Sequence, residues 1–92
     1  MQYDLSLPIE FRRINTDFWL SGFTEQIAAN CVRFRAVKWI EPSSRIEIIF
    51  RMPVSDPCNV VCSGTILGID FPEKPGTLPL ISASIDRYSF VR

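Results

Sequence analysis

Apolar and polar residues alternate strictly in several short segments of this chain, and this alternation limits the fold more than any other feature. In 32–36, two arginines separate Val32, Phe34 and Ala36. A period of two places successive side chains on opposite faces of an extended strand, so that one face is buried and the other is wet. The same pattern repeats at 45–51 and 81–86. Three such segments in one small chain predict an antiparallel, all-β fold.

The complete pattern predicts about six strands, which together form a small antiparallel barrel. Closure into a barrel removes the exposed edges that an open six-stranded sheet would leave. The fifth strand is more uniformly apolar than the others, which predicts either a strand covered on both sides or one that bends at Gly64 and Gly68. The predicted strands are Leu7–Ile14, Phe18–Ile27, Val32–Ala36, Arg45–Phe50, Asn59–Ile69 and Leu80–Phe90.

Polar or proline-rich segments separate these strands. Asn15–Asp17 is predicted as a hairpin turn, although it lacks a glycine. Proline cannot donate to a strand ladder, so proline-containing segments are predicted to end strands. These segments are Glu41–Ser44, Pro53–Pro57 and Pro72–Pro79.

Two stretches needed a choice between helix and strand. Thr24–Cys31 contains good helix formers, but eight residues make a marginal helix and strand alternation begins directly afterwards, so we predict strand, tight turn, strand. The end of the chain is short and rich in β-formers, so no substantial C-terminal helix is expected. Ile85 and Tyr88 are both expected to point inward although they are three residues apart. The alternation therefore shifts near Arg87, which predicts a bulge there.

The 92 residues correspond to one domain, 1–92, near the lower size limit for a single core. Apolar residues make up 47% of the chain, but no run approaches the roughly 18 residues of a membrane span. The first residues have neither a basic region nor a long apolar region, so they do not resemble a secretory signal. A soluble, cytoplasmic protein is expected.

Ten basic residues balance ten acidic ones, which disfavours binding to a nucleic-acid polymer, including single strands. The three cysteines, Cys31, Cys58 and Cys62, lack CxxC spacing, and the chain has no histidine. A zinc site would need four ligands, so we predict buried or half-buried thiols, no metal and no cofactor. Without histidine, and without a visible activated nucleophile, the sequence argues against an enzyme.

Residues Ser21–Ala36 carry a resemblance to a known family. Their sequence, Ser-Gly-Phe-Thr-Glu-Gln-Ile-Ala-Ala-Asn-Cys-Val-Arg-Phe-Arg-Ala, resembles the PilZ signature Asp/Asn-x-Ser-x-x-Gly. The order and spacing of the predicted strands over most of the chain are similar as well. The resemblance implies a six-stranded PilZ-like barrel and descent from a regulatory module of bacterial cyclic di-GMP signalling.

The residues by which PilZ domains hold cyclic di-GMP are replaced in this chain. Gln26 stands in place of Asp or Asn, Ala28 in place of Ser, and Cys31 in place of Gly. The family also uses an Arg-x-x-x-Arg pair before the first strand, of which the second arginine would fall near Gln2 and the first before Met1. Cys31 would strain the backbone if its position requires a positive φ. We therefore predict that the chain does not bind cyclic di-GMP in the usual mode.

Other arginines offer an alternative site. Arg33 and Arg35 share the wet face of one strand, and either Arg12 or Arg13, which point to opposite faces, could join them. Ordinary solvation explains these arginines as well, and we favour that interpretation. The aromatic residues are predicted mostly to fill the barrel, while Trp19 and Trp39 lie near turns, where exposure would indicate a contact surface. The aromatic set is Phe11, Phe18, Trp19, Phe23, Phe34, Trp39, Phe50 and Phe71.

Three functions follow from these observations. The first is a stand-alone regulatory or adaptor module related to cyclic di-GMP signalling by descent. The second is cyclic di-GMP binding through a relocated arginine site. The third is a barrel for protein interaction or self-association, since Ala28 and Cys31 make the motif turn less polar and better suited to contact with protein.

Overall fold

The computed structural model describes residues 2–3, 6–51 and 59–91, and all regular structure in these ranges is β-strand. Within them no helix occurs, and none is therefore long and apolar enough to cross a membrane. The predicted proline connection at 53–57 lies outside the described residues. The strands are β1 (Gln2–Tyr3), β2 (Pro8–Arg13), β3 (Leu20–Ala28), β4 (Cys31–Ala36), β5 (Arg45–Arg51), β6 (Asn59–Asp70) and β7 (Leu80–Val91).

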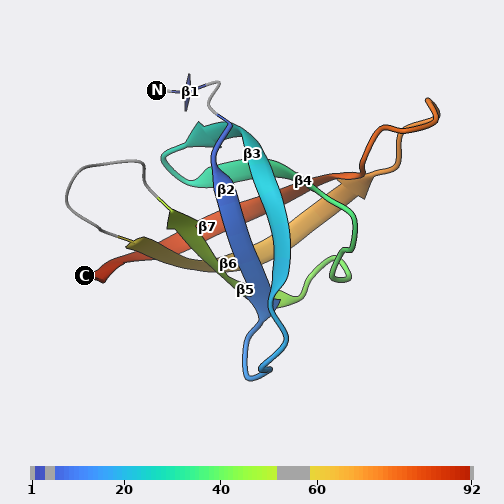
Figure 1. The fold of residues 1–92 in the computed structure, drawn as a ribbon. Helices are drawn as coiled ribbons and strands as arrows, with labels where there is room; N and C mark the ends of the chain where they lie inside the picture. Colours follow the sequence, from blue (N-terminus) through green and yellow to red (C-terminus); the bar gives the residue numbers. More distant parts are fainter. Residues whose placement is uncertain (1, 4–5, 52–58, 92) are drawn as a thin grey trace.

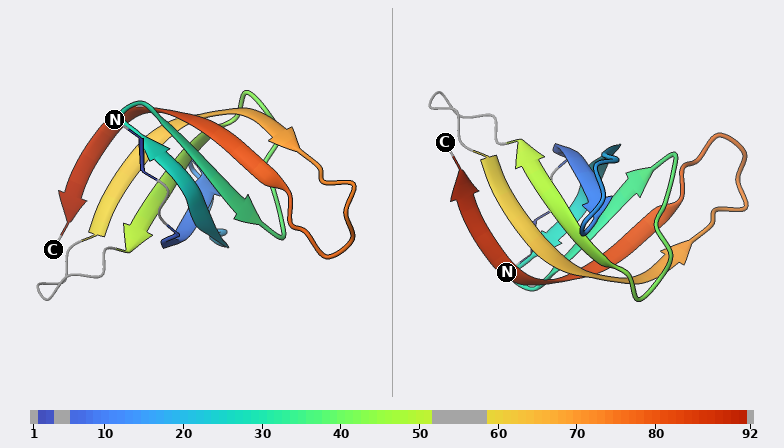
Figure 2. Two further views of the ribbon diagram at one scale, coloured as in Figure 1. Left: turned by 90° about the horizontal axis from the view of Figure 1, so that it is seen from above. Right: turned by 90° about the horizontal axis from the view of Figure 1, so that it is seen from below.

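The strands form one antiparallel sheet in the order β1-β3-β2-β5-β6-β7-β4 (Figure 1). An additional pairing between β3 and β4, from Gly22↔Ala36 to Ala28↔Cys31, closes six of these strands into a barrel. The curved strands wrap around a common interior, as Figure 2 shows from two sides. The predicted six-stranded antiparallel barrel is confirmed. The short β1, which pairs with β3 alone, was not predicted.

Alternating side chains from all six barrel strands fill the interior. In β4, Val32, Phe34 and Ala36 are buried, as their alternation predicted. Phe34 and Phe11 form the centre of the core, with ring centroids 4.9 Å apart. Other core residues come from loops and from the remaining strands, among them Ile9, Ile40, Ile46, Ile48, Phe50, Cys62, Ile66, Ile81, Ala83 and Ile85.

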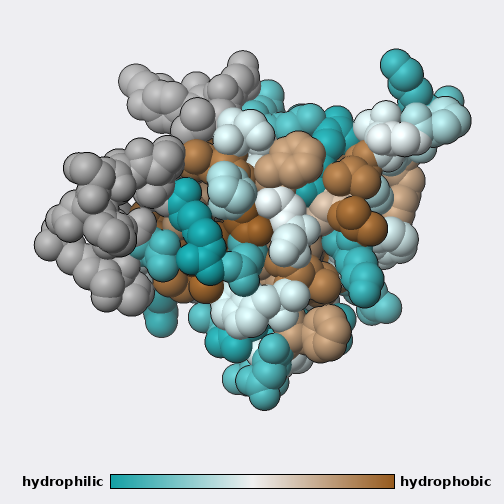
Figure 3. Space-filling view, in the orientation of Figure 1, coloured by the Kyte–Doolittle hydropathy of each residue, from teal (hydrophilic) through white to brown (hydrophobic). Residues whose placement is uncertain are grey.

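The prediction that the aromatic residues mostly fill the barrel is wrong. Only Phe11, Phe34 and Phe50 of that set are buried in the core. Phe23 lies on the outer face of β3, while Trp39 is 47% exposed in the connection after β4. Hydrophobicity alone predicted burial, but the core volume is already filled by β-branched residues, and the other rings belong to connections or to outward positions. Figure 3 shows apolar residues reaching the surface among polar ones.

Two irregularities bend the long β6–β7 pair. Ser63 pairs with Arg87 and Gly64 with Ile85, so Asp86 is an extra residue in β7. This confirms the bulge predicted near Arg87. A second shift falls between Ile66 and Gly68. Two alternatives were predicted for β6, and bending at the glycines is therefore correct. Burial on both faces is wrong, because inner and outer residues of β6 alternate in exposure.

The connection between β2 and β3 is a turn, as predicted. Asn15 adopts φ 70°, a left-handed conformation that Asn tolerates better than most residues. The amide of Thr16 donates to the carbonyl of Arg13 at 3.2 Å, and the Thr16 hydroxyl donates to the same oxygen at 2.7 Å. The following strand begins at Leu20, two residues later than predicted, because the irregular connection after this turn extends through Trp19.

Candidate functional site

The residues that correspond to the PilZ motif lie together on the β3–β4 hairpin. Gln26 pairs with Arg33, and Ala28 pairs with Cys31 at the end of the hairpin. Gln2 in β1 pairs with Ala28 from the other side, although its side chain is outside the described part of the structure. We call this group, Gln2, Gln26, Ala28, Cys31 and Arg33, the hairpin site. The fold thus brings together five of the seven residues proposed from the sequence.

Arg33 supplies the positive charge of the hairpin site, and its guanidinium lies near two polar neighbours. Its Nη1 lies 3.5 Å from Oε1 of Gln26, and its Nη2 lies 3.6 Å from Oδ2 of Asp70 at the end of β6. Both distances are at the long end of a polar contact, and the Arg33 side chain is 39% exposed. The Gln26 amide therefore interacts with protein, and the Asp70 carboxylate adds negative charge at this place.

Cys31 fits its position without backbone strain. It opens β4 in an extended conformation, paired with Ala28 on one side and with Ser84 of β7 on the other. Among the described non-glycine residues, only Asn15 and Ser43 have positive φ. A cysteine in a left-handed turn would have a strained backbone. Cys31 has no such strain, because it belongs to a regular strand. Ala28 and Cys31 together give the end of the hairpin an apolar and thiol surface.

Arg35 lies on the same outer face as Arg33 but is held by its own partners. Its Nε donates to Oε1 of Glu25 at 2.5 Å, and its Nη1 donates to the Leu78 carbonyl at 2.7 Å. Glu25 reaches this face because β3 carries a bulge between Thr24 and Gln26. A phosphate at Arg35 would have to displace a carboxylate.

Arg12 belongs to a different part of the barrel. On β2, its Nε and Nη2 donate to Oε1 of Glu47 on β5, at 3.0 Å and 2.8 Å. Its Nη1 donates to the Thr16 carbonyl at 2.9 Å, and the guanidinium carbon lies 4.4 Å from the centroid of the Trp19 ring. Arg12 therefore does not join the hairpin site, and its contacts explain why Trp19 is half-buried.

Cross-strand ion pairs neutralise most of the outer face. Besides the three arginines above, Arg51 pairs with Glu10, and Arg45 donates to Asp86. The hydrogen bond from Arg45 lowers the pKa of the Asp86 carboxyl below its usual value. Among the described arginines, Arg13 and Arg87 alone make no ion pair. The acidic partners are distant in sequence, so sequence reasoning missed them.

The described cysteines match the predicted state. Cys31 is a half-buried free thiol, and Cys62 is a buried one. Burial raises the pKa of the Cys62 thiol to about 12, so the group is neutral at physiological pH. Desolvation also raises the pKa of Tyr88, whose hydroxyl donates to the Ala29 carbonyl at 2.7 Å. Cys58 lies outside the described residues.

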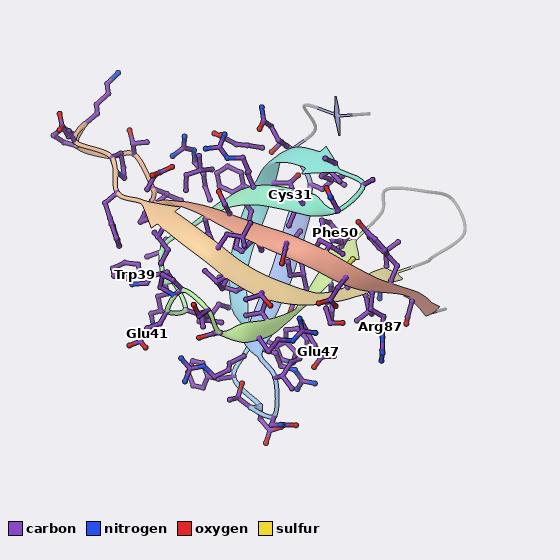
Figure 4. All side chains as sticks on the ribbon, turned by 180° about the vertical axis from the view of Figure 1, so that it is seen from behind. Cys31, Trp39, Glu41, Glu47, Phe50 and Arg87 are labelled. Atoms are coloured by element: carbon purple, nitrogen blue, oxygen red, sulfur yellow. The ribbon has the colours of Figure 1, made fainter. Side chains whose placement is uncertain are left out.

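Exposed aromatic residues gather at the opposite end of β4 from Cys31, as the labelled Cys31 and Trp39 show in Figure 4. Trp39 and Phe71 make an edge-to-face contact, with ring centroids 4.9 Å apart. Trp39 is exposed near a turn, which is the condition under which the sequence indicated a contact surface. Phe18 and Phe71 were missed because they had been assigned to the interior.

Comparisons with known proteins support the fold only. No family model and no curated protein matches the sequence. Among solved structures, the chain is similar to the Bacillus subtilis inhibitor of motility MotI/DgrA, with a TM-score of 0.76 and 10% sequence identity. The match covers 96% of this chain and 41% of that protein. This likeness supports the six-stranded barrel fold that the strand pairing forms.

Proposed function

We propose that this chain is a non-catalytic regulatory or adaptor barrel that acts through contact with protein and does not bind cyclic di-GMP in the usual PilZ mode. The observation that carries the proposal is the state of the hairpin site. Its cation, Arg33, lies between Gln26 and Asp70, while Ala28 and Cys31 replace the polar and glycine positions of the motif.

The electrostatics of the hairpin site disfavour the ligand. Cyclic di-GMP carries two negatively charged phosphates, and PilZ domains contact them with an arginine pair whose second position is occupied by Gln2 in this chain. Losing the charge-assisted contact at this position weakens binding by about one to two powers of ten. The carboxylates of Asp70 and Glu25, beside Arg33 and Arg35, would also repel the phosphates.

The structural neighbour supports a regulatory role. MotI/DgrA is an inhibitor of motility. The present chain spans less than half of that protein. We therefore propose only the shared type of role, a barrel that regulates another protein, and not the same target.

One observation favours the alternative of a relocated cyclic di-GMP site. Arg33 has the longest ion pair of the described arginines, 3.6 Å, and its partner Asp70 is 77% exposed. A ligand phosphate could replace such a partner at low cost, because exposed ion pairs contribute little. Arg33 is therefore the residue on which this alternative depends.

Isothermal titration calorimetry with cyclic di-GMP tests the proposal. We expect no binding by the native chain with a dissociation constant below about 10 µM. Tight binding that Arg33→Ala abolishes and Arg12→Ala preserves would replace the proposal with the relocated site. Arg12→Ala is a matched control because Arg12 lies outside the hairpin site.

A variant with the motif restored tests whether the hairpin site is the correct location. It combines Gln2→Arg, Gln26→Asn, Ala28→Ser and Cys31→Gly. We expect affinity for cyclic di-GMP to increase at least tenfold, roughly the contribution of one charge-assisted contact. A variant that keeps the circular dichroism of the native chain but gains no affinity would contradict our placement of the motif.

A further inference from the structure

Three exposed aromatic side chains form a rim at one end of the barrel. Phe18 lies in the β2–β3 connection, Trp39 in the β4–β5 connection and Phe71 just after β6. Their exposed fractions are 72%, 47% and 58%. The Trp39 and Phe71 rings are in contact, and Phe18 shares a groove with Trp39. We call Phe18, Trp39 and Phe71 the aromatic rim.

A groove of 370 Å³ lies between Phe18 and Trp39. Its floor is formed by Leu20 and by Ile40, a member of the core that is itself 8% exposed. The groove is thus a continuation of the barrel core to the surface. Aromatic side chains with this degree of exposure are common in protein interfaces and costly to leave in water.

Two charged residues of opposite sign line the same groove. Arg13 and Glu41 are both exposed, and neither forms an ion pair with a described residue. This distinguishes Arg13 from Arg12, which is fully engaged by Glu47 and Thr16. Figure 4 shows the labelled Trp39 and Glu41 close together at this end of the molecule. An apolar centre bordered by unpaired charges is the usual anatomy of a protein interface.

We propose that the aromatic rim is a dimerisation surface that binds a second copy of this chain. A two-fold interface places the same patch on both sides, so the patch must be complementary to itself. One unpaired cation and one unpaired anion beside an apolar groove meet this condition, because Arg13 of each copy faces Glu41 of the other. A strongly acidic or basic partner would require one sign of charge, and the chain carries none in excess.

The size of the rim determines the strength of the dimer. Three partly exposed aromatic side chains offer a few hundred Å² of apolar surface per copy, which is at the low end for specific interfaces. The dimer is therefore weak and forms at micromolar concentrations, roughly 10 to 100 µM. Cys31 of the hairpin site begins β4 and Trp39 of the rim follows the other end of this strand, whereas Asp70, which lies beside Arg33, directly precedes Phe71 of the rim.

Sedimentation equilibrium from about 5 µM to 1 mM tests the proposal. We expect a monomer–dimer equilibrium that Trp39→Ser or Phe18→Ser weakens at least tenfold. The control is Phe23→Ser, which removes an exposed aromatic side chain on the outer face of β3, outside this groove, and is expected to leave the equilibrium unchanged. Thermal melts followed by circular dichroism establish that each variant is folded.

Charge exchange identifies the partner contact. Arg13→Glu and Glu41→Arg should each weaken the dimer severalfold, and the double variant carrying both changes should restore it. A native chain that stays monomeric at 1 mM overturns the proposal. So does a Phe23→Ser variant that weakens association as much as Trp39→Ser, or a double variant as weak as the single ones. These outcomes are independent of any result with cyclic di-GMP.

Discussion

Gly64 is the residue at which the close approach of two strands is most severe. A Cβ atom at this position would lie 1.7 Å from the carbonyl oxygen of Ser84 and 2.8 Å from its carbonyl carbon. Both are backbone atoms of β7, beside the bulged Asp86, so they cannot turn aside as a side chain would. The sharp bend of the β6–β7 pair therefore depends on the missing side chain.

We predict that Gly64→Ala lowers the free energy of unfolding by about 3 kcal/mol or more, because β7 would have to move. Gly68→Ala is the matched control on the same strand, where a Cβ would meet no atom within 4 Å. That change should alter stability by no more than about 0.5 kcal/mol. Urea denaturation measures both, and equal losses in the two variants would refute the explanation.

Cys62 lowers the stability of the barrel at alkaline pH. Burial raises its pKa to about 12 in the folded state, whereas an unfolded cysteine titrates near 8.5. Above pH 8.5 the unfolded chain therefore binds fewer protons than the folded one, and stability falls as pH rises. Below that pH the contribution of the neutral thiol is complete.

We predict a loss of about 1 kcal/mol from this group between pH 7.5 and 9.5 under reducing conditions. Cys62→Ala lowers stability at every pH through the cavity that it leaves, but it should remove this part of the pH dependence. Urea titrations of both proteins at several pH values make the comparison. An equally steep alkaline decline in Cys62→Ala would assign the effect to other groups.

The β2–β5 strand pair carries two arginine–glutamate pairs that differ in their surroundings. Arg12 contacts Glu47, the Thr16 carbonyl and the Trp19 ring, and its side chain is 26% exposed. Arg51 contacts Glu10 and is 52% exposed. The first guanidinium is held by three kinds of partner, whereas the second is an ordinary surface ion pair.

We predict that Arg12→Ala destabilises the barrel by about 1 to 2 kcal/mol, because it removes a cation–π contact and several charge-assisted hydrogen bonds together. Arg51→Ala should cost less than about 0.5 kcal/mol. Urea denaturation measures both free energies of unfolding, because urea, unlike guanidinium, is uncharged and does not screen the ion pairs. Similar effects in the two variants would show that the Trp19 contact adds nothing.

Sequence alternation predicted the strands well because burial on one face imposes it. The predicted bounds of β4, β5, β6 and β7 agree with the structure to within one residue. β1 has only two residues, which is too short to show an alternating pattern, and it pairs with β3 of the β3–β4 hairpin. The aromatic rim was missed because hydrophobicity does not distinguish a ring inside a barrel from one in a connection.

The candidate site shows the same limit. The motif spacing brought Gln26, Ala28 and Cys31 together correctly, since these residues share one hairpin. It could not show that Asp70 lies beside Arg33, because that contact joins the end of β6 to β4 through the closure of the barrel. Local pattern thus predicts local geometry, whereas charge partners across strands require the fold.

Closure joins the six barrel strands into one continuous ring. Each of the six barrel strands pairs with two others, and the pairing of β4 with both β3 and β7 completes the ring. Phe34 of β4 and Phe11 of β2 contact each other in the shared core. Loss of β4 would therefore open the ring and expose the core at once.

We accordingly predict two-state unfolding in urea, with the same midpoint by far-UV circular dichroism and by tryptophan fluorescence. The first probe reports on all strands, and the second on Trp19 and Trp39 in the connections. Phe34→Leu, which perturbs the core contact with Phe11, should shift both midpoints downward together, by about 1 kcal/mol of stability. Separate midpoints, or a Phe34→Leu variant that shifts only one probe, would show that part of the sheet survives without β4.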